Sequence, residues 1–247
     1  MMKADREFVF GIHSVHEAVE SGSEIDRILV RKDYSNSQIK DILSNGYRLN
    51  IPIQKVPKEK LNAITKKTHQ GIIAFLSAIK YASLDHVISD AYSQGTDPLM
   101  LMLDHITDVH NLGAISRTAE GLGFNGIILP SRGSARLNSE AVKISAGALM
   151  HLPVCRVKSL LSTIEYLKNN GIRIIACTEK ADDSIYAADM TGPACLIFGS
   201  ESDGISREIL KKSDMKVNIP MHGKVSSFNV SVSMAITGSE LIRQRRR

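Results

Sequence analysis

The chain has 247 residues, 43% of them hydrophobic, and a formal net charge of +5 at pH 7. These values are typical of a globular protein with one large domain or two small ones, and no run approaches the length of a membrane span. The N-terminus has no charged-then-apolar export signal, so a cytoplasmic protein is expected, and the basic surplus favours a polyanionic partner.

The cysteine and histidine patterns argue against metal and disulfide chemistry. Cys155, Cys177 and Cys195 form no Cys-x-x-Cys pair, which is typical of small buried residues in a reducing compartment. The eight histidines show no metal-ligand spacing. No metal site is therefore predicted.

Residues 1–78 are predicted to form a small α/β domain. Its expected strands are 26–31, 51–56 and 72–76, and its expected helices are 14–21 and 38–43. Asn45-Gly46 is expected to stop the second helix, and Pro57 to open a third. Five lysines lie close together and indicate either a solvated face or an RNA-binding one: Lys55, Lys58, Lys60, Lys66 and Lys67.

Residues 79–97 are predicted to be a linker with one helix, Leu84 to Tyr92, capped by Ser83. From residue 98 the pattern alternates strand and helix, which predicts a parallel sheet. The expected strands are 99–103, 126–129, 172–177, 195–198 and 216–219. The expected helices are 112–121, 138–148, 159–169, 205–212 and 227–243. Gly121 to Gly126 spells Gly-x-Gly-x-x-Gly, but it ends a helix and precedes a strand, so it is not a dinucleotide site.

Three of the predicted strands run into polar loops, and such loops meet outside the carboxyl ends of a parallel sheet. The first loop holds Asn111 and Arg117, the second Glu201, and the third Ser227. Each has a plain structural alternative. Asn111 and Ser227 could be helix caps, Glu201 an exposed turn residue, and Arg117 a surface partner of Glu120.

Together the three blocks resemble the signature motifs of the SpoU-type RNA ribose 2′-O-methyltransferases. The matching residues, in motif order, are Asn111 and Arg117, then Gly199, Glu201 and Gly204, then Ile219, Pro220, Met221, Ser227, Asn229, Val230 and Ser231. The segments beginning at Phe10 and His69 resemble the small substrate-binding domain that precedes the catalytic domain in many of these enzymes. Among them, the bacterial enzyme that methylates a guanosine of 23S rRNA is the most similar.

The resemblance implies a fold, a reaction and a set of residues. Residues 98–247 would form a parallel-sheet methyltransferase domain with a deep trefoil knot, in a homodimer. The reaction would transfer a methyl group from S-adenosylmethionine to a ribose 2′-hydroxyl of RNA. The implied catalytic residues are Asn111, Arg117, Glu201, Ser227 and Asn229. The implied cofactor-binding residues are Thr178, Gly199, Ile219 and Phe228.

Two alternatives and one mechanistic question stay open at this point. The RNA could be tRNA, or the chain could be a non-catalytic RNA-binding or ribosome-assembly factor. Arg117 has been cast as the base in this family, but a guanidinium stays protonated above pH 12, which favours stabilisation of developing negative charge.

Overall fold

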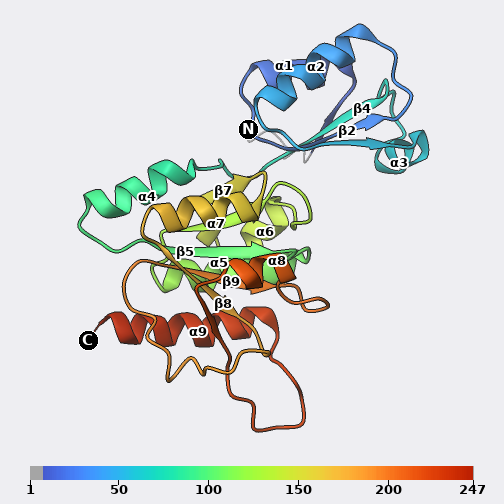
Figure 1. The fold of residues 1–247 in the computed structure, drawn as a ribbon. Coiled ribbons are helices and arrows are strands. Elements are labelled where there is room, and N and C mark those ends of the chain that lie inside the picture. The colour runs from blue at the N-terminus through green and yellow to red at the C-terminus, as the bar shows by residue number, and fades with distance from the viewer. Residues whose placement is uncertain (1–7, 247) are drawn as a thin grey trace. The chain divides into compact units, whose positions relative to one another are not determined.

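The computed structural model describes residues 8–246. Residues 1–7, which the sequence assigned to the first domain, and Arg247 lie outside the described residues. The chain divides into two compact units (Figure 1). Unit 1 comprises the residues up to Lys80 together with Arg136–Ser139, and unit 2 comprises Tyr81–Ala135 and Glu140–Arg247.

Unit 1 is a four-stranded sheet with helices on both faces. The strands stand in the order β1 (Phe8–Phe10), β4 (Ile72–Leu76), β2 (Ile25–Arg31) and β3 (Ile53–Val56). The helices are α1 (Ile12–Glu20), α2 (Ser37–Arg48) and α3 (Lys58–Ile64). Alternate residues serve opposite faces: Ile28 packs in the core with α1 and α2, whereas Leu29 packs with Leu61 of α3.

Two expectations for unit 1 were wrong in detail, and one strand was missed. α2 does not stop at Asn45-Gly46 but continues to Arg48, because Gly46 lies inside the core, where an added Cβ would be 3.2 Å from Ile53 Cδ1. Pro57 precedes α3 as its N-cap instead of opening it. The three-residue edge strand β1 was not predicted, since so short a run gives little periodicity.

Unit 2 contains the predicted parallel sheet, with six strands in the order β10-β8-β9-β5-β6-β7. These are β5 (Leu99–Asp104), β6 (Gly126–Pro130), β7 (Val154–Val157), β8 (Arg173–Cys177), β9 (Ala194–Gly199) and β10 (Met215–Val217). Every recorded pairing is parallel. The five predicted strands are confirmed, and the sixth, β7, is a four-residue edge strand that the sequence analysis missed.

Helices cover both faces of this sheet. They are α4 (Leu84–Ser93), α5 (Val109–Gly121), α6 (Ser139–Ile144), α7 (Leu160–Asn169), α8 (Arg207–Lys212) and α9 (Val230–Arg245). Figure 1 shows α4 and α7 on one side of the sheet and α9 on the other. The expected helix 138–148 is broken after α6, because Ala146 and Gly147 both adopt positive φ angles.

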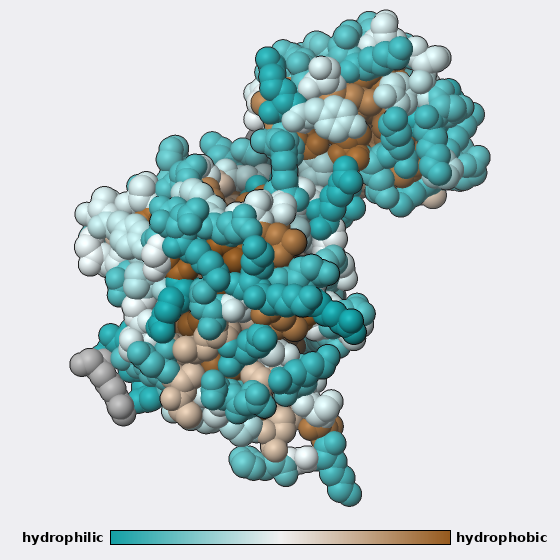
Figure 2. Space-filling model, viewed as in Figure 1, coloured by the Kyte–Doolittle hydropathy of each residue, from teal (hydrophilic) through white to brown (hydrophobic). Residues whose placement is uncertain are grey.

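The interval expected to be a linker, 79–97, contributes directly to unit 2. Val87 and Ile88 of α4 are buried in its core with residues of β5, β9 and α7. Tyr81 also forms a bridge to Val154 of β7. Figure 2 shows mainly hydrophilic residues on the visible face of each unit, with hydrophobic residues in the gaps. Between residues 8 and 246, no helix is long and apolar enough to cross a membrane.

Candidate active site

A cavity of about 310 Å³ lies at the carboxyl ends of β8, β9 and β10. This is the edge where ligands bind in open parallel sheets. All four residues expected to contact the cofactor line it: Thr178, Gly199, Ile219 and Phe228. Of the expected catalytic residues, Glu201 and Ser227 line it as well. The sequence analysis assigned no role to four other lining residues in the loops after β8 and β9: Glu179, Lys180, Ser202 and Asp203.

The cavity wall depends on Gly199. A Cβ there would lie 2.0 Å from the carbonyl carbon of Gly204 and 2.2 Å from the backbone nitrogen of Ile205. The chain folds back so tightly because Gly204 N–H donates to the Ser200 carbonyl at 2.9 Å, with Gly204 at a φ of 69°. Only glycine permits both the close approach and the left-handed angle.

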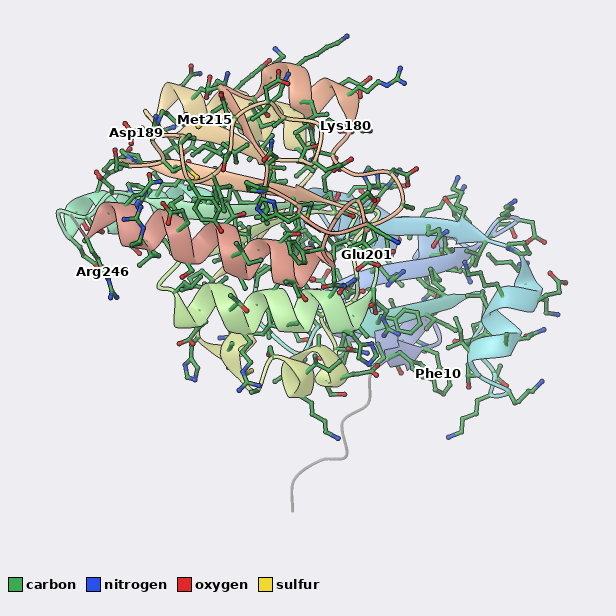
Figure 3. The ribbon with its side chains drawn as sticks, turned by 90° about the horizontal axis from the view of Figure 1, so that it is seen from below. Phe10, Lys180, Asp189, Glu201, Met215 and Arg246 are labelled. Atoms are coloured by element: carbon green, nitrogen blue, oxygen red, sulfur yellow. The ribbon has the colours of Figure 1, made fainter. Side chains whose placement is uncertain are left out.

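Asn111 of α5, Glu201 of the loop after β9 and Asn229 at the N-cap of α9 come together from three separate parts of the chain. Asn111 Nδ2 donates to Glu201 Oε1 at 3.1 Å, and Asn229 Nδ2 donates to Asn111 Oδ1 at 3.0 Å and also to Glu201 Oε1. Figure 3 shows Glu201 beside the N-terminal end of α9. The side chains are partly or largely exposed. A ligand can therefore reach this triad of Asn111, Glu201 and Asn229.

The helix-cap alternatives for Asn111 and Ser227 were wrong. α5 begins earlier than expected, and its N-cap is Asp108, whose Oδ1 accepts from His110 N–H at 3.0 Å. That backbone hydrogen bond is the main reason why the pKa of Asp108 is lowered. α9 begins later than expected, with Asn229 as its cap. Asn111 and Ser227 are consequently available to the site.

Arg117 does not join the triad. Its side chain is exposed on α5, does not line the cavity, and makes no recorded hydrogen bond or ion pair with any residue from 8 to 246, Glu120 included. Arg117 follows Asn111 by six residues, about 600° of rotation, so the two side chains leave the helix on different faces.

The side chains that line the cavity suit S-adenosylmethionine. Ile219 and Phe228 offer apolar walls for a flat ring, and the carboxylates of Glu179 and Asp203 suit a cationic group and hydroxyls. Burial raises the pKa of the Cys177 thiol, so this residue is a protonated part of the wall and not a nucleophile. The described residues contain no group of three or more His, Cys, Asp or Glu side chains that could hold a metal ion.

Two family models match the chain. One, the SpoU rRNA methylase family, matches residues 98–238, and the other, RNA 2′-O ribose methyltransferase substrate binding, matches residues 8–82. The chain belongs to the SpoU methylase family. This SpoU methylase is by class an RNA ribose 2′-O-methyltransferase that uses S-adenosylmethionine.

Relatives of the SpoU methylase resemble it over nearly its whole length. Two carry names that provisionally assign them to the TrmH family of tRNA/rRNA methyltransferases. That of Staphylococcus saprophyticus is 37% identical over 237 residues, covering 96% of this chain and 95% of the relative. That of Bacillus subtilis is 33% identical over 244 residues, covering 99% of this chain and 98% of the relative.

Solved structures share the fold of the SpoU methylase. AviRb of Streptomyces viridochromogenes, in complex with AdoMet, has a TM-score of 0.60 and 24% identity, covering 96% of this chain and 89% of that one. The AdoMet-bound rRNA methyltransferase of Sinorhizobium meliloti has a TM-score of 0.59 and 21% identity, covering 96% of this chain and 86% of that one. The TrmH/SpoU tRNA modifying enzyme of A. aeolicus has a TM-score of 0.56 and 29% identity, covering 61% of this chain and 77% of that one.

Proposed function

We propose that this SpoU methylase modifies a guanosine ribose of 23S rRNA, with the triad of Asn111, Glu201 and Asn229 as the centre of its active site. One observation carries the proposal: these three side chains, from three separate parts of the chain, bind one another within about 3 Å beside a cavity that Glu201 also lines. The carboxyl ends of parallel strands, and the loops that follow them, are where binding and catalytic residues are concentrated.

The triad would position the ribose. S-adenosylmethionine, when bound, supplies an electrophilic methyl group. The chain must then align the attacking hydroxyl with that methyl and stabilise the charge that develops on the oxygen. Amide groups of Asn111 and Asn229 can donate to ribose oxygens, and Glu201 holds both amides in one orientation. Arg117 would supply the positive charge, and Ser227 a further hydroxyl at the cavity.

Arg117 is proposed to act in a homodimer, on the active site of the second copy. Within one chain Arg117 lies on a different face of α5 from Asn111, and it has no partner among residues 8–246. Exposed apolar side chains at and near the cavity support an interface there: Val225, Phe228 and Val232. The parallel contact of Asn218 with Ser184 supports the knotted path of the family, because the segment after β10 runs along the loop after β8.

Coverage supports ribosomal RNA over tRNA as substrate. The structure named as a tRNA modifying enzyme leaves more than a third of this chain without a counterpart, whereas the one named as an rRNA methyltransferase covers 96% of it. Unit 1, which the substrate-binding model matches, would then serve a larger RNA.

Mapping ribose methylation across all rRNA and tRNA in cells with and without the gene tests the assignment. The expected result is the loss of one 2′-O-methyl group, on a guanosine of 23S rRNA, restored by the wild-type gene. Restoration must fail with the Asn229→Ala variant. Loss of a methyl group from tRNA alone would contradict the rRNA assignment and favour the tRNA alternative.

A further inference from the structure

Unit 1 contains a second cavity, of about 480 Å³, far along the sequence from the catalytic motifs. It lies between the loop after β2 and the loop before β4. The residues that line this cleft are Arg31, Tyr34, Ser35, Asn36, Ile39, Lys58, Asn62, Lys66, Lys67, Thr68, His69, Gln70 and Gly71. We call it the β2–β4 cleft.

The charge of the β2–β4 cleft favours an anionic ligand. Four of its lining side chains are cationic, and none of the described residues that line it is Asp or Glu. Arg31 has one carboxylate neighbour, Asp33, whose Oδ1 lies 2.8 Å from Arg31 Nε. Lys58, Lys66 and Lys67 are exposed and make no recorded ion pair with residues 8–246. Three lysines are thus available to phosphate groups.

The loop that carries two of these lysines is held in a fixed shape. His69 is only 7% exposed, and its Nδ1 accepts from Gly71 N–H at 3.0 Å. The hydrogen is therefore on Nε2, which donates to Asn62 Oδ1 at 2.9 Å. Gln70 has a positive φ of 51°, and its Oε1 accepts from Ile12 N–H at 2.9 Å. The binding surface is formed before any ligand arrives.

Tyr34 adds an aromatic surface to the rim of the β2–β4 cleft. Its ring is partly buried against the core of unit 1, which limits its rotation. Lys55 Nζ lies over the ring, 5.5 Å from its centroid, and a base that stacks on the exposed face of Tyr34 would take the place of this cation. Phosphate-binding lysines beside an aromatic ring are the combination that binds unpaired nucleotides in single-stranded RNA.

We infer that the β2–β4 cleft binds one unpaired nucleotide of the RNA substrate, with its phosphates against Lys58, Lys66 and Lys67 and its base against Tyr34. This inference rests on the proposed function for its ligand, because the RNA must be the substrate of the catalytic unit. A concave site of this size favours a base that is out of a helix, since the grooves of duplex RNA present backbone and not a base face.

Binding of a fluorescein-labelled 12-nucleotide single-stranded RNA to the full chain, followed by anisotropy at several salt concentrations, tests the inference. The combined Lys58→Gln, Lys66→Gln and Lys67→Gln variant is expected to lower the slope of log K against log salt by up to about 1.4, at roughly 0.7 for each of the two phosphates that flank one nucleotide. Lys60→Gln is the matched control, because Lys60 is exposed on α3 outside the cleft and should bind as wild type does.

The ring of Tyr34 is tested with Tyr34→Phe and Tyr34→Ala. The Phe variant should retain binding, and the Ala variant should weaken it roughly five- to a hundredfold, the scale for losing one stacked base. In methyl transfer, Tyr34→Ala should raise KM for RNA and leave kcat and S-adenosylmethionine affinity unchanged, and Tyr34→Phe should change none of the three.

Three results would overturn the inference. The first is a triple lysine variant that binds like Lys60→Gln, and the second is a blunt duplex of the same sequence that binds as tightly as the single strand. The third is displacement of the strand by AMP at AMP concentrations below the Kd of the strand. That result would mean that the cleft is a site for free nucleotides. Failure of the proposed function looks different: the wild type would transfer no methyl group to 23S rRNA, while the cleft variants still altered strand binding.

Discussion

Arg117 is exposed on α5 and has no recorded partner among the described residues, so its removal should cost little stability. A surface ion pair would contribute only about 0–1 kcal/mol, and none involving Arg117 is recorded among residues 8–246. Arg117→Ala is expected to leave unfolding and S-adenosylmethionine affinity nearly unchanged and to cut single-turnover methyl transfer by roughly a hundredfold or more. Arg117→Lys should not restore the rate, because an ammonium lacks the planar fork of donors. Glu120→Ala is the control, and a near-normal rate for Arg117→Ala would refute the catalytic role.

Asn229 combines a structural and a proposed catalytic task in one side chain. Its Oδ1 caps α9 by accepting from Ser231 N–H at 2.9 Å, while its Nδ2 donates to Asn111 and Glu201. Asn229→Ala should lose both functions and about 1 kcal/mol of stability. Asn229→Asp keeps the cap but loses the donor and sets a second carboxylate beside Glu201, so it should unfold at a somewhat lower urea concentration than the wild type and fail to transfer methyl groups. Efficient methylation by the Asp variant would show that the amide donors are dispensable.

The loop from Gly199 to Gly204 shapes the cavity by a close approach of backbone to backbone. Gly199→Ala would place a Cβ within 2.0 Å of Gly204, and backbone cannot move aside as a side chain can. We expect strain of roughly 1–3 kcal/mol and a loss of S-adenosylmethionine affinity, measured by calorimetry. Gly121→Ala is the matched control, because a Cβ there meets nothing within 4 Å. Equal affinities for the two variants would mean that the loop does not form the cofactor wall.

Helix α4 lies in the segment that was expected to be a linker, but it belongs to the core of unit 2. Val87 and Ile88 are buried in the core of unit 2, so a chain that begins at Pro98 exposes the surface they cover. It should be roughly 3–6 kcal/mol less stable than one beginning at Tyr81, at 1.5–3 kcal/mol for each side chain. Urea unfolding of both chains measures this difference, and equal midpoints would exclude a core role for α4. The chain from Tyr81 should bind cofactor but methylate its natural RNA poorly, because it lacks unit 1.

At the scale of the whole molecule, Arg117 acts either on the active site of its own chain or on that of the second subunit of a dimer. Mixing Arg117→Ala subunits with Asn229→Ala subunits distinguishes the two arrangements. If Arg117 serves the second copy, a mixed dimer has one site with both residues intact, and methyl transfer reappears although each variant alone is inactive. If Arg117 serves its own chain, every site in the mixture lacks one residue and the rate stays low. Sedimentation of the mixture must first establish that subunits exchange.

Local pattern was sufficient for much of unit 2. A buried parallel strand is a continuous apolar run, as in Leu99 to Leu103, and such runs are visible without knowledge of the fold. The resemblance of the loops after these strands to the SpoU motifs implied Asn111, Glu201 and Asn229 as site residues, and the structure brings the three within hydrogen-bonding distance. The short edge strands β1 and β7 were not predicted from the sequence, because three or four residues show too little periodicity.

Tertiary contacts decided the rest, since they outweigh local preference. Gly46 looked like a helix stop, but its lack of a side chain lets α2 pack closely on Ile53. Asn229 and not Ser227 caps α9, because the triad holds its amide at that place. The sequence showed a concentration of lysines, yet only the fold separates Lys58, Lys66 and Lys67 in one cleft from Lys60 outside it. Which side chains share a concave surface depends on how strands and loops are arranged in space, and no local pattern encodes that arrangement.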